Sequence, residues 1–219
     1  MDWIDLPESN FLRTGIKNYE HGKMYGMLIQ FPWFVAPSWN RIMRAHSHVK
    51  NKISRLTDAW VAESLMGRHV PGVLCHEYLQ LIRPNERRKR DLKVLKEQNV
   101  HDARWVKSVL ERGYLRETIS KSPPQFQHGV SINIFHFRKR QIDLDNLCVK
   151  FLIDGLVEVG LLSDDNHKQI RALQQIQLPA KMLVTPLSDP GEEMVMVEIT
   201  ECPDVAREGE VIMVGPDFP

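Results

Sequence analysis

Two aspartates separated by one residue, Asp143 and Asp145, have the spacing of paired acid ligands. In an extended segment, side chains two residues apart point to the same side, with Cα atoms roughly 6–7 Å apart. Two carboxylates that close repel each other unless a cation lies between them. Mg²⁺ suits such a pair, because it binds one or two carboxylates together with water and phosphate oxygens. The alternative is a helix N-cap followed by a solvated acidic turn.

A strand pattern and a helix pattern flank this acidic pair. Residues 130–137 alternate β-branched and aromatic side chains with smaller or polar ones, which predicts a strand. Residues 147–161 repeat apolar side chains at helical spacing, which predicts a helix with Asp145 or Asn146 as its N-cap. Gly160 suits the end of that helix. The acidic pair therefore lies between a strand and a helix.

A second acidic pair, Asp164 and Asp165, follows the predicted helix, and Lys150 lies near the start of that helix. A helix of about fifteen residues spans roughly 22 Å. The second acidic loop must therefore fold back if it is to complete one site with Asp143 and Asp145.

The order of these features resembles the RusA family of Holliday junction resolvases, which is common in bacteriophages and prophages. The shared features are a strand, a basic run (138–140), the D-L-D-N-L motif (143–147), a lysine, and D-G-L followed by G-x-x-x-D-D. The resemblance covers residues 130–178 well and residues 24–66 more loosely. In the second range, FPWFVAPSWNR (31–41) is similar to the family's P-P-S-x-N segment.

The resemblance implies a role for each matching residue. Asp143, Asp145 and Asp165 match the acidic triad that binds Mg²⁺, with Mn²⁺ as an alternative ion. Lys150 matches the catalytic lysine. The residues that the resemblance places against DNA are Asn40, Arg138, Lys139 and Arg140, and Arg41 is a further candidate because it begins a basic stretch (41–52) suited to phosphate contact. Asp154 and Asp164 also match family positions, but we do not count them as metal ligands.

Two departures from the family pattern concern the same segment. Lys150 lies five residues after Asp145 instead of four, and on an α-helix that change turns a side chain by about 100°. Ile142 stands where the family has an arginine, with Arg140 two residues earlier. The first departure puts the position of Lys150 in question and leaves the three aspartates unaffected.

The resemblance also implies a fold and an activity. The fold is α+β, with the order β-α-β-α-β-β, a mixed sheet and here a helical insertion before the active-site strand. The activity is that of a crossover junction endodeoxyribonuclease, a Mg²⁺-dependent enzyme that resolves four-way DNA junctions by paired symmetric nicks. A homodimer is implied, since two nicks in strands of like polarity match a two-fold axis.

Three other functions stay open on the sequence alone. The chain could be a general flap or branched-DNA nuclease, or a branched-DNA-binding protein that has lost catalysis, for which the shifted Lys150 is the one hint. It could also be a regulatory interaction domain in which the D-L-D-N match is accidental. If the chain is a nuclease, we expect it to act in DNA recombination, repair or replication.

The charge distribution divides the chain more clearly than its total. The 219 residues carry a formal net charge of +1, which predicts no class of partner. Residues 83–121 contain twelve Lys or Arg against six Asp or Glu, and residues 185–219 contain nine acidic residues against one arginine. We expect an N-terminal arm (1–23), one nuclease-like domain (24–202) with a basic helical insertion (84–122), and an acidic tail (203–219).

The cysteines and the hydrophobic pattern predict a cytoplasmic protein, and the resemblance implies that the cell is bacterial or phage-infected. The three cysteines, Cys75, Cys148 and Cys202, are odd in number and show no metal-ligand spacing. No stretch approaches 18 consecutive apolar residues, and the N-terminal decapeptide is acidic, so neither a membrane span nor a signal peptide is predicted.

Periodicity predicts the remaining elements. We expect strands at 24–31, 74–82 and 194–200, and helices at 49–66, 88–98 and 101–116. The alternation at 167–178 is imperfect, and the strand expected there is implied by the order of elements in the family that the chain resembles. Three aromatic residues near the first strand, Trp33, Phe34 and Trp39, either cap the core or stack on unpaired bases. Capping the core is the interpretation we favour for all three.

Overall fold

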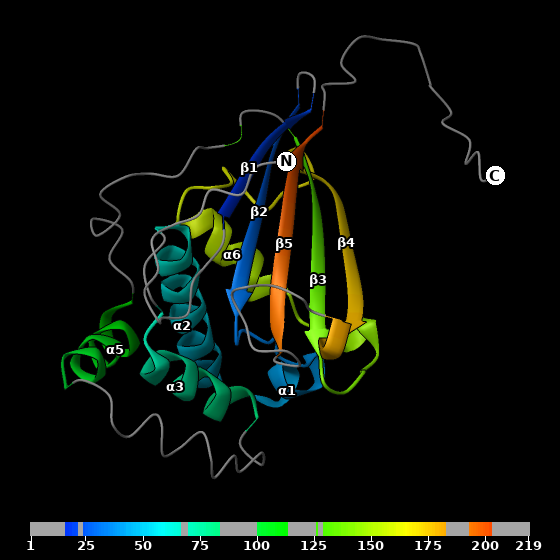
Figure 1. The fold of residues 1–219 in the computed structure, drawn as a ribbon. Helices are drawn as coiled ribbons and strands as arrows, with labels where there is room; N and C mark the ends of the chain where they lie inside the picture. Colours follow the sequence, from blue (N-terminus) through cyan, green and yellow to red (C-terminus); the bar gives the residue numbers. More distant parts are fainter. Residues whose placement is uncertain are drawn as a thin grey trace.

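Five strands form one mixed sheet in the order β1-β2-β5-β3-β4 (Figure 1). The structure is a computed structural model that describes residues 16–21, 24–66, 70–83, 100–113, 126, 129–182 and 193–202. The strands are β1 (Ile16–His21), β2 (Met24–Pro32), β3 (Val130–Arg138), β4 (Ile170–Pro179) and β5 (Met194–Glu201). Strands β3 and β4 pair in parallel, and the other neighbours are antiparallel.

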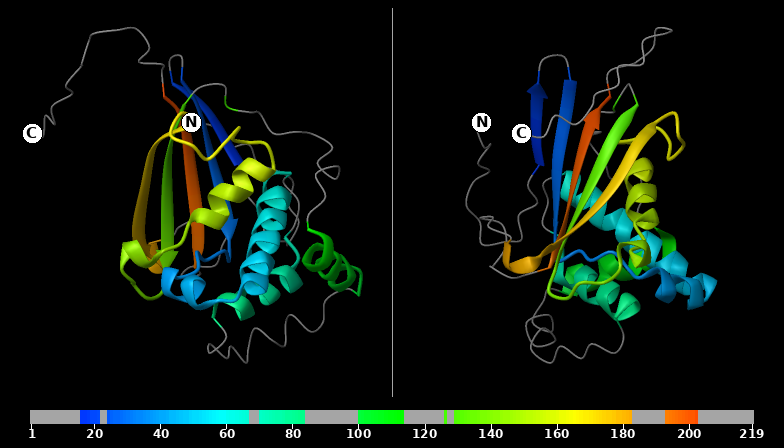
Figure 2. Two further views of the ribbon diagram at one scale, coloured as in Figure 1. Left: turned by 180° about the vertical axis from the view of Figure 1, so that it is seen from behind. Right: turned by 90° about the vertical axis from the view of Figure 1, so that its right-hand side faces the viewer.

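Helices cover one face of this sheet, with α2 and α6 lying across it (Figure 2). The helices are α1 (Trp39–Arg44), α2 (Ser47–Leu65), α3 (Gly72–Ile82), α5 (Val100–Arg112) and α6 (Lys150–Glu158). Two short 3₁₀ helices, η2 (Leu144–Asn146) and η3 (Ala180–Met182), complete the described elements. The sequence-based expectation of an α+β fold with a mixed sheet is confirmed.

The core lies between the sheet and α2. Phe34 follows β2 and is buried against Trp60 of α2 and Tyr78 of α3, with ring centroids 5.4 and 5.1 Å away. The Tyr78 hydroxyl donates a hydrogen bond to the Val35 carbonyl at 3.0 Å, so its polar end is satisfied inside the core. This aromatic cluster joins the end of β2 to two helices.

Most elements expected from periodicity are present. The strands expected at 24–31, 130–137, 167–178 and 194–200 are confirmed as β2, β3, β4 and β5. The helices expected at 49–66 and 101–116 are confirmed as α2 and α5, although α5 ends earlier, with Gly113 at a positive φ of 82°. The helix expected at 88–98 lies outside the described residues, as do most of the expected insertion and the acidic tail. Residues 16–21 of the expected arm form β1, which pairs with β2.

Two of the expectations about secondary structure are wrong. Residues 74–82 form helix α3 and not a strand, because Leu74, Tyr78 and Ile82 recur every fourth residue and are buried on one side of a helix. The central helix begins at Lys150, so neither Asp145 nor Asn146 is its N-cap, and Val149 takes that position. Its predicted end is confirmed, since Gly160 has a φ of 80°.

The pairing of β3 with β4 determines how the chain passes the candidate site. Two neighbouring parallel strands need a crossover connection, and α6 supplies it here.

In the described part of the chain, no helix is long and apolar enough to cross a membrane.

Replacing Phe34 by alanine should destabilise the protein strongly, because it empties the centre of the aromatic cluster. We expect a loss of about 3–5 kcal/mol in the free energy of unfolding, measured by urea denaturation. Met182→Ala is the control, since Met182 is 61% exposed and should cost less than about 0.5 kcal/mol. Equal losses for the two variants would contradict this assignment of the core.

Candidate functional site

The D-L-D-N segment forms a tight turn instead of an extended strand end. Asp143 is the N-cap residue of η2, with φ −61° and ψ 134°, and Asp145 lies inside this 3₁₀ helix. A 3₁₀ helix has three residues per turn, so residues two apart point in different directions. The expectation that Asp143 and Asp145 share one side of an extended segment is therefore wrong.

Gln177 of β4 fixes the residue that precedes this turn. Its side-chain oxygen accepts a hydrogen bond from the Ile142 N–H at 3.1 Å. Its side-chain nitrogen donates to the Ile142 carbonyl at 3.0 Å. Because both backbone groups of Ile142 are held, the start of the acidic turn has a defined position beside β4.

The proline-rich segment after β2 lies directly against the acidic turn. Ser38 forms an isolated antiparallel bridge with Leu147, and the Cys148 N–H donates to the Pro37 carbonyl at 2.9 Å. The Asn40 N–H donates to the side-chain oxygen of Asn146 at 3.1 Å, across 106 residues of sequence. The two segments that carry the resemblance in the two halves of the chain are thus neighbours in space.

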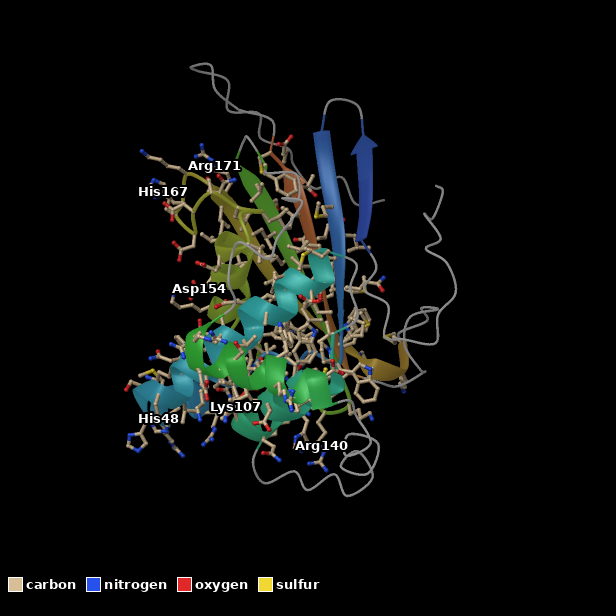
Figure 3. The ribbon with its side chains drawn as sticks, turned by 90° about the vertical axis from the view of Figure 1, so that its left-hand side faces the viewer. His48, Lys107, Arg140, Asp154, His167 and Arg171 are labelled. Carbon is tan, nitrogen blue, oxygen red and sulfur yellow. The ribbon has the colours of Figure 1, made fainter. Side chains whose placement is uncertain are left out.

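Lys150 lies at the start of α6 between two carboxylates. Its ammonium donates to Asp154 at 2.9 Å and lies 3.7 Å from the Asp165 carboxylate. The hydrogen bond to Asp154 raises the pKa of Lys150, and the charges of Asp154 and Asp165 raise it too. Lys150 therefore carries a positive charge. Figure 3 shows Asp154 on the outer side of the molecule, below His167.

Within the second acidic loop, Asp164 and Asp165 have different partners. Asp164 accepts hydrogen bonds from the Asp165 N–H at 2.7 Å and from the side-chain nitrogen of Asn166. Asn166 in turn accepts from the Lys168 N–H at 2.8 Å. Asp164 therefore organises the loop, while the Asp165 carboxylate is turned toward Lys150. The loop returns far enough to bring Asp165 to Lys150, but among the described residues it does not complete one site with Asp143 and Asp145.

The three carboxylates expected to bind a metal are not gathered around one point. Among the described residues, no group of three or more His, Cys, Asp or Glu side chains is placed to hold a metal ion. Asp143 and Asp145 are exposed and have no hydrogen bond or ion pair from their side chains to another described residue. The ligand types fit Mg²⁺, whereas their present arrangement does not form its ligand set.

The basic run after β3 divides into a buried and an exposed part. Arg138 is 8% exposed and its guanidinium donates to the Ala36 carbonyl at 3.4 Å, so it braces the proline-rich segment from inside. Lys139 and Arg140 are exposed. The structure therefore leaves these two, and not Arg138, on the surface where DNA could reach them.

Glu193, which the sequence analysis missed, holds this basic run in place. Its carboxylate accepts the Lys139 N–H at 3.2 Å and forms an ion pair with Arg83 at 2.6 Å. Burial alone would raise the pKa of Glu193, but Arg83 and the Lys139 N–H lower it below its usual value. A buried acidic residue just before a strand gives no signal in the sequence, because its partners come from distant elements.

The two DNA-contact candidates on α1 also differ in exposure. Asn40 is exposed, with its backbone bonded to Asn146. Arg41 is half-buried, and its Nε donates to the Leu81 carbonyl at 3.0 Å, which ties α1 to the end of α3.

A second residue missed by the sequence analysis is Asp58, which lies where α2 packs on α6. Gly155 allows this close packing, since a β-carbon there would lie 3.2 Å from Val61 and 3.5 Å from the Asp58 carboxylate. Burial raises the pKa of Asp58 to about 7, and the nearby charges of Glu158 and Asp154 contribute. The carboxyl group of Asp58 is thus close enough to Asp154, the hydrogen-bond partner of Lys150, for their charges to interact.

Comparison with known protein families and with curated proteins found no match for this chain.

The folded protein should lose stability as pH rises toward 7, because of Asp58. Its folded pKa of about 7 lies above its ordinary value of 3.8, so the folded state binds the proton more tightly. The contribution is complete below about pH 4 and is lost as pH rises through about 7, at a cost on the order of 4 kcal/mol. Asp58→Asn should remove this part of the pH dependence in urea unfolding at several pH values. Asp143→Asn, at an exposed position, should leave it unchanged, and an unaltered slope in Asp58→Asn would contradict the assignment.

Proposed function

We propose that this chain is a RusA-like, Mg²⁺-dependent endonuclease that resolves four-way DNA junctions by paired symmetric nicks. It would act as a homodimer in the cytoplasm of a bacterial or phage-infected cell, in recombination, repair or replication. Asp143, Asp145 and Asp165 would be the metal ligands, and Lys150 the catalytic lysine.

The meeting of two distant segments is the observation that carries this proposal. Pro37 to Asn40 and Asn146 to Cys148 are joined by one β-bridge and two hydrogen bonds. The resemblance assigns both segments to the site, and nothing in their separate compositions requires them to touch. An accidental match of the D-L-D-N motif would not explain why the second matching segment lies beside it.

The order of elements gives further support. From β2 onward the described chain runs strand, helices, strand, helix, strand and strand, which is the order that the resemblance implies. The placement of Asp165 within 3.7 Å of Lys150 is also in keeping with a site that uses both residues.

Mg²⁺ is the cofactor that this proposal requires. When bound, it would position a water molecule and stabilise the negative charge that develops on the phosphate oxygens during hydrolysis. The acidic turn and the Asp165 loop supply the carboxylates, and Gln177 and Asn40 hold that turn by its backbone and by Asn146.

The remaining proposed roles belong to cations. The Lys150 ammonium would stabilise negative charge on the phosphate or protonate the leaving oxygen, and its raised pKa keeps it protonated for either task. Lys139 and Arg140 are exposed beside the turn and would contact backbone phosphates, so binding should weaken steeply with salt.

A junction-binding protein without catalysis is the second candidate. Two observations favour it: the three carboxylates do not form a ligand set, and Lys150 is engaged by both Asp154 and Asp165. Such a protein would bind four-way junctions with the same surface and leave them intact.

Replacing Asp145 by asparagine should abolish junction cleavage while leaving junction binding in place. A labelled four-way junction and a matched linear duplex are incubated with protein in Mg²⁺ or EDTA. Loss of a metal ligand should reduce the nicking rate by at least about a hundredfold. Asp102→Asn on α5 is the matched control. Paired nicks that persist in the Asp145 variant would contradict the site, and binding without nicks by the unaltered protein would favour the second candidate.

Replacing Lys150 by glutamine should separate chemistry from binding. The cleavage rate should fall by about a hundredfold, the usual contribution of a proton donor, with junction affinity changed less than about tenfold. Lys107→Gln is a matched control, because Lys107 forms the same type of i,i+4 ion pair, with Glu111 at 3.9 Å. A fall in affinity as large as the fall in rate would mean that Lys150 only contacts the DNA backbone.

A further inference from the structure

Exposed hydrophobic side chains are concentrated beside the acidic turn. Trp39 and Met43 of α1 are 44% and 68% exposed, and Leu144 of η2 is 42% exposed. These are three of the five exposed large hydrophobic residues in the described part of the chain. Helix α1 contacts η2, so the three belong to two adjoining elements, which we call the α1–η2 surface.

The exposure of Trp39 is not a consequence of a poorly packed helix. Trp39 and Met43 are four residues apart and so lie on the same face of α1. Ile42 of the same short helix is buried and anchors α1 to the core. Phe34, only five residues before Trp39, is buried in the core. The expectation that all three aromatic residues cap the core thus fails for Trp39.

The chain next to this surface is strongly basic. From Trp39 to Thr57 the sequence contains five Lys or Arg and no Asp or Glu. The exposed basic or titratable residues in this stretch are Arg44, His46, His48 and Lys52. The His46 and His48 rings stack with centroids 5.8 Å apart, and Figure 3 shows His48 at the outer edge of the molecule.

A partner that suits this combination is a polyanion with exposed apolar faces. Paired duplex DNA presents phosphates to a protein, but its base faces are covered by stacking. Unpaired bases offer a flat face that an aromatic side chain can stack on, next to phosphates that cations contact. A purely apolar partner would leave the adjoining cations without a function.

We propose that the α1–η2 surface holds unpaired bases of branched DNA, with Trp39 as the stacking residue and Met43 and Leu144 beside it. This inference rests on the proposed function and names what distinguishes a junction from a duplex at this site. Asn40, the neighbour of Trp39, is bonded to Asn146. A base stacked on Trp39 therefore lies close to the acidic turn.

The test compares two DNA probes and three variants by fluorescence anisotropy. One probe is a four-way junction with two unpaired thymines at its centre, and the other is a fully paired duplex of equal length. Trp39→Ala should weaken binding to the first probe by about tenfold or more and to the duplex by less than about twofold. Trp39→Phe should recover most of the loss. Leu173→Ala is the control, because Leu173 is equally exposed (48%) but lies on β4.

The outcomes separate this inference from the proposed function. If the unaltered protein binds neither probe, the proposed function fails. If it binds the junction and Trp39→Ala weakens both probes equally or neither, the stacking role is overturned and the function stands. If Trp39→Ala instead changes the sedimentation coefficient of the protein, the surface is a contact between two copies of the chain, which also overturns the proposal.

Discussion

The parallel pairing of β3 with β4 is the constraint on which the candidate site depends. The chain leaves β3 at one end of the sheet and must return to the other end before β4 can begin. Asp143 and Asp145 lie at the beginning of this connection, directly after β3. Asp165 lies near its end, just before β4. Helix α6 has nine residues and spans roughly 13 Å. Lys150, at its start, is the residue whose side chain reaches Asp165.

Strand β3 and helix α2 were accessible from sequence because each has one clear period. Strand β3 alternates buried and partly exposed residues, and α2 repeats a buried stripe that includes Ile53, Leu56 and Trp60. Helix α3 was mistaken for a strand because residues 74–82 form a short apolar run, which suits a strand and a buried helix equally. Only its packing against α2 distinguishes the two.

For the candidate site, the sequence predicted only the residues that belong to its motifs. Spacing and resemblance identified Asp143, Asp145, Lys150 and Asp165, but not the groups that hold them. Gln177 and Glu193 act through partners 35 and 54 residues away, and no local pattern marks such contacts. The aromatic residues show the same limit, because Phe34 and Trp39 have similar hydrophobicity, and only the packing buries one and exposes the other.

The spacing between Asp145 and Lys150 has a different meaning in the structure from the one it has in the sequence. An extra residue would turn Lys150 by about 100° only if one continuous helix carried both residues. Asp145 lies in η2, Lys150 begins α6, and Leu147 between them has extended dihedral angles of −89° and 116°. The extra residue is therefore accommodated in the connection, and α6 keeps its own internal spacing from Lys150 to Asp154. What positions the lysine is the ion pair with Asp154 and the returning Asp165 loop, so the departure from the family spacing does not by itself argue against a catalytic Lys150.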